Sequence, residues 1–217
     1  MKRRKKQRTQ KQRSLRLGIW VAVLTLFVVS SGIYTPFPQM LIRQGEVSLS
    51  CGETELARKE TLDRRPYFLT SNQHTVLLTV GEYSAILGWQ GYAARSLDLS
   101  QTDGPLAVAV LRTSPRKIKD PKDDVLTTHY FGVAPREAPS VLIHFLLVED
   151  AQPLELPTFR GEDGRTYFWG WQDVPSYGRG GYNSDFYSEP LLVEALDRDG
   201  NVIATCTYSY YYPGLVP

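Results

Sequence analysis

An uncharged apolar run beside a cluster of basic residues constrains this chain more than any other feature. Residues 17–34 read LGIWVAVLTLFVVSSGIY, and the next charged residue after this run is Arg43. A helix of about 20 apolar residues, rising about 1.5 Å per residue, crosses a hydrocarbon core of about 30 Å. We therefore predict a single transmembrane helix over residues 17–36.

The residues before the apolar run predict its orientation. Residues 1–16 contain no Asp or Glu and nine basic residues: Lys2, Arg3, Arg4, Lys5, Lys6, Arg8, Lys11, Arg13 and Arg16. Such clusters stay in the cytoplasm, where they also contact anionic lipid headgroups. The rest of the chain has more acidic than basic residues, so we expect no nucleic-acid partner. The sequence thus predicts a single-pass protein of the cell membrane with its C-terminal domain outside the cytoplasm.

A cleavable signal peptide has the same charge polarity and is the alternative interpretation. Ser30, Ser31 and Gly32 supply the small residues that a signal peptidase requires. The basic region is long for a signal peptide, however, and apolar residues continue beyond the run to Leu41. These features favour a retained anchor.

The remainder of the chain has the composition of a folded β domain. Pro36 and Pro38 predict an extended stalk over residues 37–46, and residues 47–217 contain no linker that would divide them. Residues 53–65 are charged and can hold a short helix. Runs rich in β-branched and aromatic residues predict strands at 74–80, 106–112, 125–133, 140–149, 165–171, 191–197 and 201–211. The expected fold is mainly β: a β-sandwich (Ig-like or similar) or a partly open barrel of about 6–8 strands.

The last two predicted strands form the clearest hairpin. They flank Arg198, Asp199 and Gly200, and an Asp-Gly pair provides the positive φ that tight turns need. The alternation of acids here is also found in calcium loops, but the Gly and Glu positions of an EF-hand are not matched. We interpret this segment as a turn.

The two cysteines lie near the ends of the predicted domain. Cys51 follows the stalk and Cys206 belongs to the last strand. Outside the cytoplasm disulfides persist, so one bridge between these residues is expected. Two free buried thiols are the alternative.

No catalytic, metal or cofactor motif is recognisable in the sequence. His74, His129 and His144 lack metal-ligand spacing, and no serine elbow or phosphate-binding loop occurs in its required context. Acidic residues are numerous, so the hypothesis of a glycoside hydrolase with two catalytic carboxylates stays open. Its test is the distance between the two carboxylates, which depends on the fold. We predict no cofactor and favour a protein that is not an enzyme.

Aromatic residues are concentrated between residues 167 and 187. Flat rings on a polar loop add contact area for a sugar or peptide with little loss of conformational entropy. The alternative is that the first of these residues are core residues of the β domain. The expected ligand-binding residues are Trp169, Trp171, Tyr177, Tyr182, Phe186 and Tyr187.

These features lead to three ranked hypotheses for function. The first is a non-catalytic, membrane-tethered domain that binds a component of the cell envelope, either a protein or a glycan. The second is a structural or accessory subunit of a membrane complex, in which the transmembrane helix makes the contacts. The third is a carbohydrate-active hydrolase.

Overall fold

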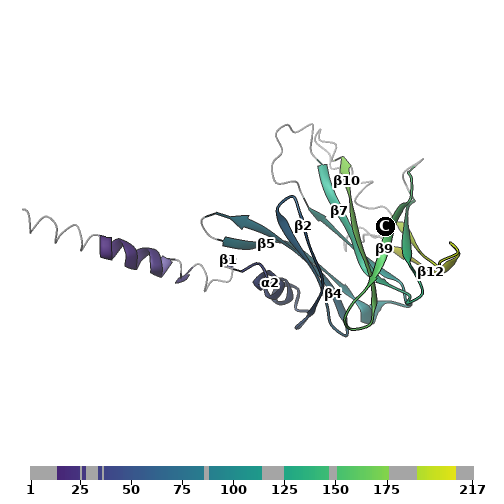
Figure 1. Cartoon of the computed structure of the whole chain (residues 1–217), viewed down its shortest axis with the longest axis horizontal. Coiled ribbons are helices and arrows are strands. Elements are labelled where there is room, and N and C mark those ends of the chain that lie inside the picture. The colour runs from purple at the N-terminus through teal and green to yellow at the C-terminus, as the bar shows by residue number, and fades with distance from the viewer. Residues whose placement is uncertain are drawn as a thin grey trace, which may run out of the picture.

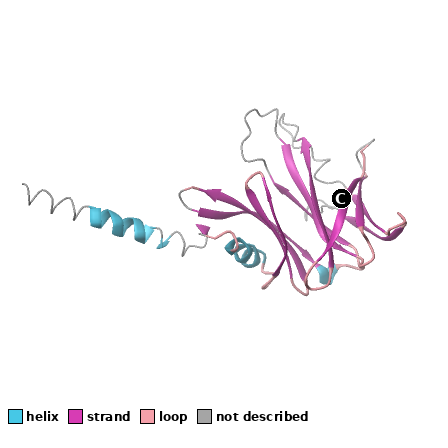
Figure 2. Cartoon of the chain, viewed as in Figure 1, coloured by secondary structure: helices cyan, strands magenta, loops and turns pink. Residues whose placement is uncertain are grey.

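Apolar and β-branched runs between turn residues form most of this protein's structure. The computed structural model describes residues 14–24, 26–27, 34–35, 37–85, 88–113, 125–146, 151–175 and 190–208. These residues form twelve strands and few helices (Figure 2). The elements are β1 (Tyr34–Thr35), α2 (Met40–Leu49), β2 (Glu55–Leu62), β3 (Arg65–Ser71), β4 (Thr75–Ser84), β5 (Gly88–Asp98), η1 (Leu99–Gln101), β6 (Ala107–Thr113), β7 (Val125–Ala134), β8 (Ser140–Phe145), β9 (Leu154–Arg160), β10 (Thr166–Pro175), β11 (Leu191–Leu196) and β12 (Val202–Tyr208).

The strands form two antiparallel sheets. The first has the order β1-β5-β4-β3-β2, and the second has the order β12-β11-β8-β9-β10-β7-β6 and curves into a half-barrel (Figure 1). Strand β4 illustrates how the first sheet buries both of its faces. Its side chains alternate: Val76, Leu78 and Val80 belong to the core between the sheets, whereas Gly81 and Thr79 lie against helix α2.

The half-barrel encloses a second core on its concave side. Along β6, Val108 and Val110 point into this core, while Ala109 and Leu111 point into the core that joins the two sheets. Alternation of side chains along a strand explains this division, because successive residues face opposite sides of a sheet. Strands β6, β7 and β10 therefore have buried residues on both faces.

Helix α2 covers the outer face of the first sheet. Leu41 is fully buried there, and its Cδ1 atom occupies the space where Gly81 would carry a Cβ. Gly45 approaches Thr79 in the same way, since a Cβ on Gly45 would lie 2.5 Å from Thr79 Oγ1. Two glycines thus allow helix and sheet to pack closely.

The mainly β prediction is confirmed, but the expected number of about 6–8 strands is too low, because the described residues form twelve. Residues 40–49 form α2, where an extended stalk was expected, because Leu41 gains more by packing on the sheet than by exposure. Residues 55–62 form β2, where a short helix was considered; its pairing with β3 provides the hydrogen bonds. Strands β3, β5 and β9 were also not predicted.

The predicted transmembrane segment is described only in part. Residues 14–24 and 26–27 are helical, and residues 34–35 form β1; residues 25, 28–33 and 36 lie outside the described ones. Within the described ranges, no helix is both long and apolar enough to cross a membrane.

The contact between α2 and β4 generates a prediction for stability. Gly81→Ala places a methyl group against the buried Leu41 and should lower the free energy of unfolding by about 1–3 kcal/mol. Gly104→Ala is the control, because no atom lies within 4 Å of its added Cβ, and it should change stability by less than about 0.5 kcal/mol. Urea unfolding followed by circular dichroism measures both.

A double-mutant cycle identifies the cause of this effect. In a Leu41→Ala background, the clashing Cδ1 atom is absent, so the added Gly81→Ala change should cost less than in the parent protein. An equal cost in both backgrounds would contradict the proposed contact.

Candidate functional site

Strand β10 carries a row of side chains whose exposure increases along the strand. On the face toward the first sheet, Tyr167 is fully buried and Trp169 is 4% exposed. Trp171 is partly buried and packs against the same core, and Asp173 is exposed. The row therefore runs from the centre of the core to one end of the two sheets.

Four rings from three strands meet near this end. We call Tyr67, His129, Trp169 and Trp171 the aromatic cluster. Ring centroids lie 4.7 Å apart for Tyr67 and His129, 5.9 Å for Tyr67 and Trp169, 5.9 Å for Trp169 and Trp171, and 6.3 Å for His129 and Trp171. The rings are tilted at 37° to 52° to one another, within the distance range in which aromatic pairs attract.

His129 occupies the centre of the cluster as a neutral side chain. It is fully buried, and burial lowers the pKa of its imidazole from 6.5 to about 4. Its Nε2 atom lies 3.4 Å from Thr113 Oγ1. In the described part of the chain, neither His129 Nδ1 nor Trp169 Nε1 has a hydrogen-bond partner. Buried polar atoms without partners are costly and rare, so these two atoms lower the stability that the packing of the cluster provides.

The first sheet contributes a buried cation at the same end. Two contacts show how β3 lies along β10. The Tyr167 hydroxyl donates a hydrogen bond of 2.8 Å to Ser71 Oγ, and Tyr67 packs against Trp169. Lower residue numbers in β3 therefore lie closer to the Trp171 end. Arg65 follows at that end, only 5% exposed. Its guanidinium lies 4.1 Å from the ring centroid of Tyr92 and 3.7 Å from Glu82 Oε1.

The opposite end of the two sheets is closed by polar contacts. The Arg165 guanidinium donates hydrogen bonds to the backbone carbonyl oxygens of Asn72 and Gln73, which belong to the turn between β3 and β4. The Tyr167 hydroxyl lies 2.5 Å from Asp163 Oδ2, and burial is the main cause that raises its pKa. The hydrogen bonds of Arg165 thus connect the turn before β10, in the second sheet, to the β3–β4 turn of the first sheet.

Two of the six predicted ligand-binding residues belong to the aromatic cluster. Trp169 is a core residue, as the alternative interpretation held, and Trp171 lies at the edge of that core. Tyr177, Tyr182, Phe186 and Tyr187 lie within residues 176–189, outside the described residues.

Sequence reasoning missed Arg65, Tyr67 and His129. Tyr67 lies 62 positions before His129 in the chain, and the packing of separate sheets brings them together. Arg65 ends a charged stretch, and nothing in its local pattern distinguishes it from a surface residue. The burial of His129 follows from its neighbours on other strands, which the sequence does not specify.

The predicted disulfide between Cys51 and Cys206 is wrong, because both cysteines are free. Cys51 follows α2 on the outer face of the first sheet, whereas Cys206 lies in β12, an edge strand of the other sheet (Figure 1). A disulfide needs Cα atoms within about 7 Å of each other. Cys51 and Cys206 lie near the two ends of the domain sequence, but this position in the sequence does not make them neighbours in the fold. Burial raises the pKa of the Cys206 thiol to about 11.

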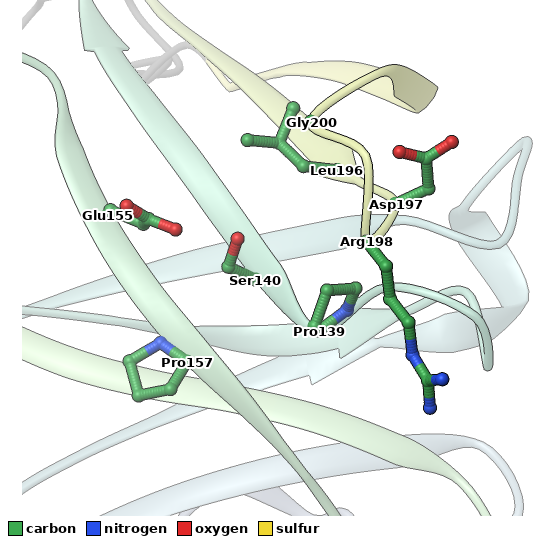
Figure 3. Close-up of a pocket in the computed structure, with 8 residues that line it drawn as sticks. All are labelled: Pro139, Ser140, Glu155, Pro157, Leu196, Asp197, Arg198 and Gly200. Atoms are coloured by element: carbon green, nitrogen blue, oxygen red, sulfur yellow. The ribbon is translucent and has the colours of Figure 1, made fainter.

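The hollow beside the β11–β12 turn lacks converging chemical groups. Its volume is about 510 Å³, and it is lined by Pro139, Ser140, Glu155, Pro157, Leu196, Asp197, Arg198 and Gly200. Figure 3 shows the Arg198 side chain extending away from Glu155. The Asp197 carboxylate accepts hydrogen bonds from the backbone N–H groups of Asp199 and Asn201, which confirms the predicted hairpin turn. Across the described ranges, no group of three or more His, Cys, Asp or Glu residues is placed to hold a metal ion.

The buried imidazole predicts a pH dependence of stability. The unfolded chain binds a proton at His129 below about pH 6.5, but the folded protein does so only below about pH 4. Stability from this residue is therefore complete above pH 6.5 and is lost as the pH falls toward 4, by about 3 kcal/mol in total. The His129→Gln variant should lack this part of the pH dependence. The measurement is the free energy of unfolding in urea at several pH values. An unchanged slope in the variant would contradict a buried, neutral His129.

The free cysteines generate a second prediction. Unfolded, unreduced protein should take up two carbamidomethyl groups from iodoacetamide, as measured by mass spectrometry. In the folded protein Cys206 should react slowly at about pH 8, because little of a thiol with a raised pKa is ionised. Protein that takes up no label until it is reduced would instead contain the disulfide.

No protein-family model, no curated protein and no solved structure matches this chain. Its function is therefore inferred from its own residues. Two features provide the basis: the exposed apolar side chains among the helical residues 14–24 and 26–27, and the end of the two sheets where the aromatic cluster and Arg65 lie.

Proposed function

We propose that the chain is a membrane-tethered, non-catalytic protein whose β domain lies outside the cytoplasm and binds a protein or glycan of the cell envelope. The observation that carries the proposal is the exposure of the N-terminal helical residues. Nine apolar side chains there are 54% to 75% exposed: Leu15, Leu17, Ile19, Trp20, Val21, Val23, Leu24, Leu26 and Phe27. In Figure 1 this helix lies apart from both sheets. A helix that is apolar on all sides is stable only when protein or lipid surrounds it.

The basic residues before the apolar run support the proposed orientation. Each Lys or Arg near an anionic leaflet contributes about 1 kcal/mol of attraction, and nine such residues precede the apolar run. Clusters of this kind are retained on the cytoplasmic side. The β domain then lies on the other side of the membrane.

The end of the sheets at Trp171 is the proposed binding surface. It combines the partly buried Trp171 with the buried Arg65 on Tyr92, and aromatic residues and Arg dominate binding energy at protein interfaces. Aromatic rings also provide flat surfaces for glycans. We favour binding over catalysis because His129 has no carboxylate partner among the described residues, whereas a histidine that activates a nucleophile is usually oriented by a third group.

Substitution of Trp171, together with two aromatic residues that follow it in the sequence, tests the proposed surface. Trp171→Ala, Tyr177→Ala and Tyr182→Ala together should reduce retention of the full chain on isolated cell envelope by at least about tenfold, since such residues each contribute about 1–2 kcal/mol. Circular dichroism should show an unchanged fold. The control is Val202→Ala with Ile203→Ala, which removes exposed apolar side chains from β12. Equal retention of the triple variant and the control would exclude this surface.

Replacement of the helix separates this proposal from a subunit whose transmembrane helix makes the contacts. Residues 17–33 are exchanged for an unrelated apolar span, and envelope retention and resistance to alkaline extraction are measured. The proposal requires both properties to survive the exchange. Loss of retention with intact membrane association would assign the contacts to the helix.

A further inference from the structure

The chain enters the β domain through a short strand that pairs with the first sheet. Strand β1 pairs with β5, with Tyr34 opposite Gln90 and Thr35 opposite Trp89. Helix α2 begins at Met40, five positions after the last residue of β1. The point where the chain enters the domain is thus held at the end of β5 next to the β4–β5 hairpin.

Helix α2 strengthens this attachment from the outer face of the sheet. The Gln44 side-chain oxygen accepts a hydrogen bond of 3.0 Å from the backbone N–H of Gly91 in β5. Leu41 and Gly45 pack on Gly81 and Thr79 of β4. Helix α2 is therefore held on β4 and β5 by both packing and a hydrogen bond.

Uncharged apolar and aromatic side chains gather where the chain enters the domain. We call Phe37, Met40, Tyr83 and Trp89 the entry surface. Phe37 is 63% exposed, and Met40 and Tyr83 are each 45% exposed. Tyr83 and Trp89 are opposite each other in the β4–β5 pair, with ring centroids 4.9 Å apart. Figure 1 shows β1, the hairpin end of β5 and α2 on the side of the sheets that faces the N-terminal helix.

We propose that the entry surface rests in the headgroup region of the lipid bilayer. This inference rests on the proposed membrane tether and goes beyond it, because a tether alone leaves the domain free to tumble. Tyr and Trp side chains favour the boundary between lipid and water, where the ring is partly dehydrated and the polar atom stays hydrated. Continuity with the apolar helix through β1 selects lipid, and not another protein, as the occupant.

This arrangement gives the domain a defined orientation. The β4–β5 end lies at the membrane, and β12, on the far side of the half-barrel in Figure 1, lies away from it. An envelope ligand approaches the domain from the aqueous side.

Spin labels on the full chain in vesicles of phosphatidylcholine and phosphatidylglycerol test the inference. The background carries Cys51→Ala and Cys206→Ala, and single labels follow Met40→Cys, Tyr83→Cys, Val202→Cys or Trp20→Cys. Relaxation by oxygen, which concentrates in lipid, is compared with relaxation by a water-soluble nickel chelate. Labels at positions 40 and 83 should show an oxygen-to-nickel ratio about threefold above that at position 202 and below that at position 20.

The outcomes distinguish the entry surface from the tether. If positions 40 and 83 match position 202 while position 20 is buried in lipid, the tether stands and the entry surface is wrong. If position 20 is itself accessible to the nickel chelate, both proposals are overturned.

A second variant tests whether the side chains themselves cause the contact. Phe37→Ser with Tyr83→Ser should lower the oxygen-to-nickel ratio of the label at position 40 by about half or more, because these exposed residues would no longer favour the interface. The conservative pair Phe37→Leu with Tyr83→Phe should retain it. A ratio that is the same in the serine pair as in the parent would overturn the proposal.

Discussion

Packing of Tyr67, Phe131, Tyr167 and Trp169 between the two sheets is the interaction on which the rest of the structure depends. These side chains are at most 4% exposed, and aromatic residues of this size each bury roughly 150–250 Å². Each sheet has an apolar face that would otherwise meet water. Joining these faces also determines where His129 and Arg65 lie. Side chains alternate between the two faces of a strand, and His129 and Arg65 are each two positions from a residue of this core.

Helix α2 is the second constraint, and it connects the domain to the N-terminal segment. The Glu46 carboxylate, 6% exposed, accepts hydrogen bonds from the backbone N–H and the hydroxyl of Thr54 (2.6 and 2.8 Å). This contact holds the chain where it leaves the helix and enters β2. Helix α2 and the strands that it covers therefore form one packed unit, and the proposed binding surface belongs to this unit.

The sequence predicted the strands whose patterns are local and missed those whose patterns depend on packing. Residues 106–112 are apolar and β-branched, and they form β6 as expected. Residues 55–62 are mostly polar or charged, and they form an edge strand only because β3 provides hydrogen bonds along one side. The predicted disulfide failed for a related reason, since Cys51 and Cys206 belong to parts of the domain whose separation depends on how the sheets fold.

The sequence by itself determined the apolar run, its flanking charges, the mainly β character and the turn at Gly200. These are properties of neighbouring residues, set by hydrophobicity, side-chain branching and backbone preference. Only the tertiary structure decided the strand order, the burial of His129, the position of Arg65 beside Tyr92 and the packing of α2 on Gly81. Each of these depends on contacts between residues far apart in the chain, and such contacts arise from the burial of whole sheet faces, which no local pattern encodes.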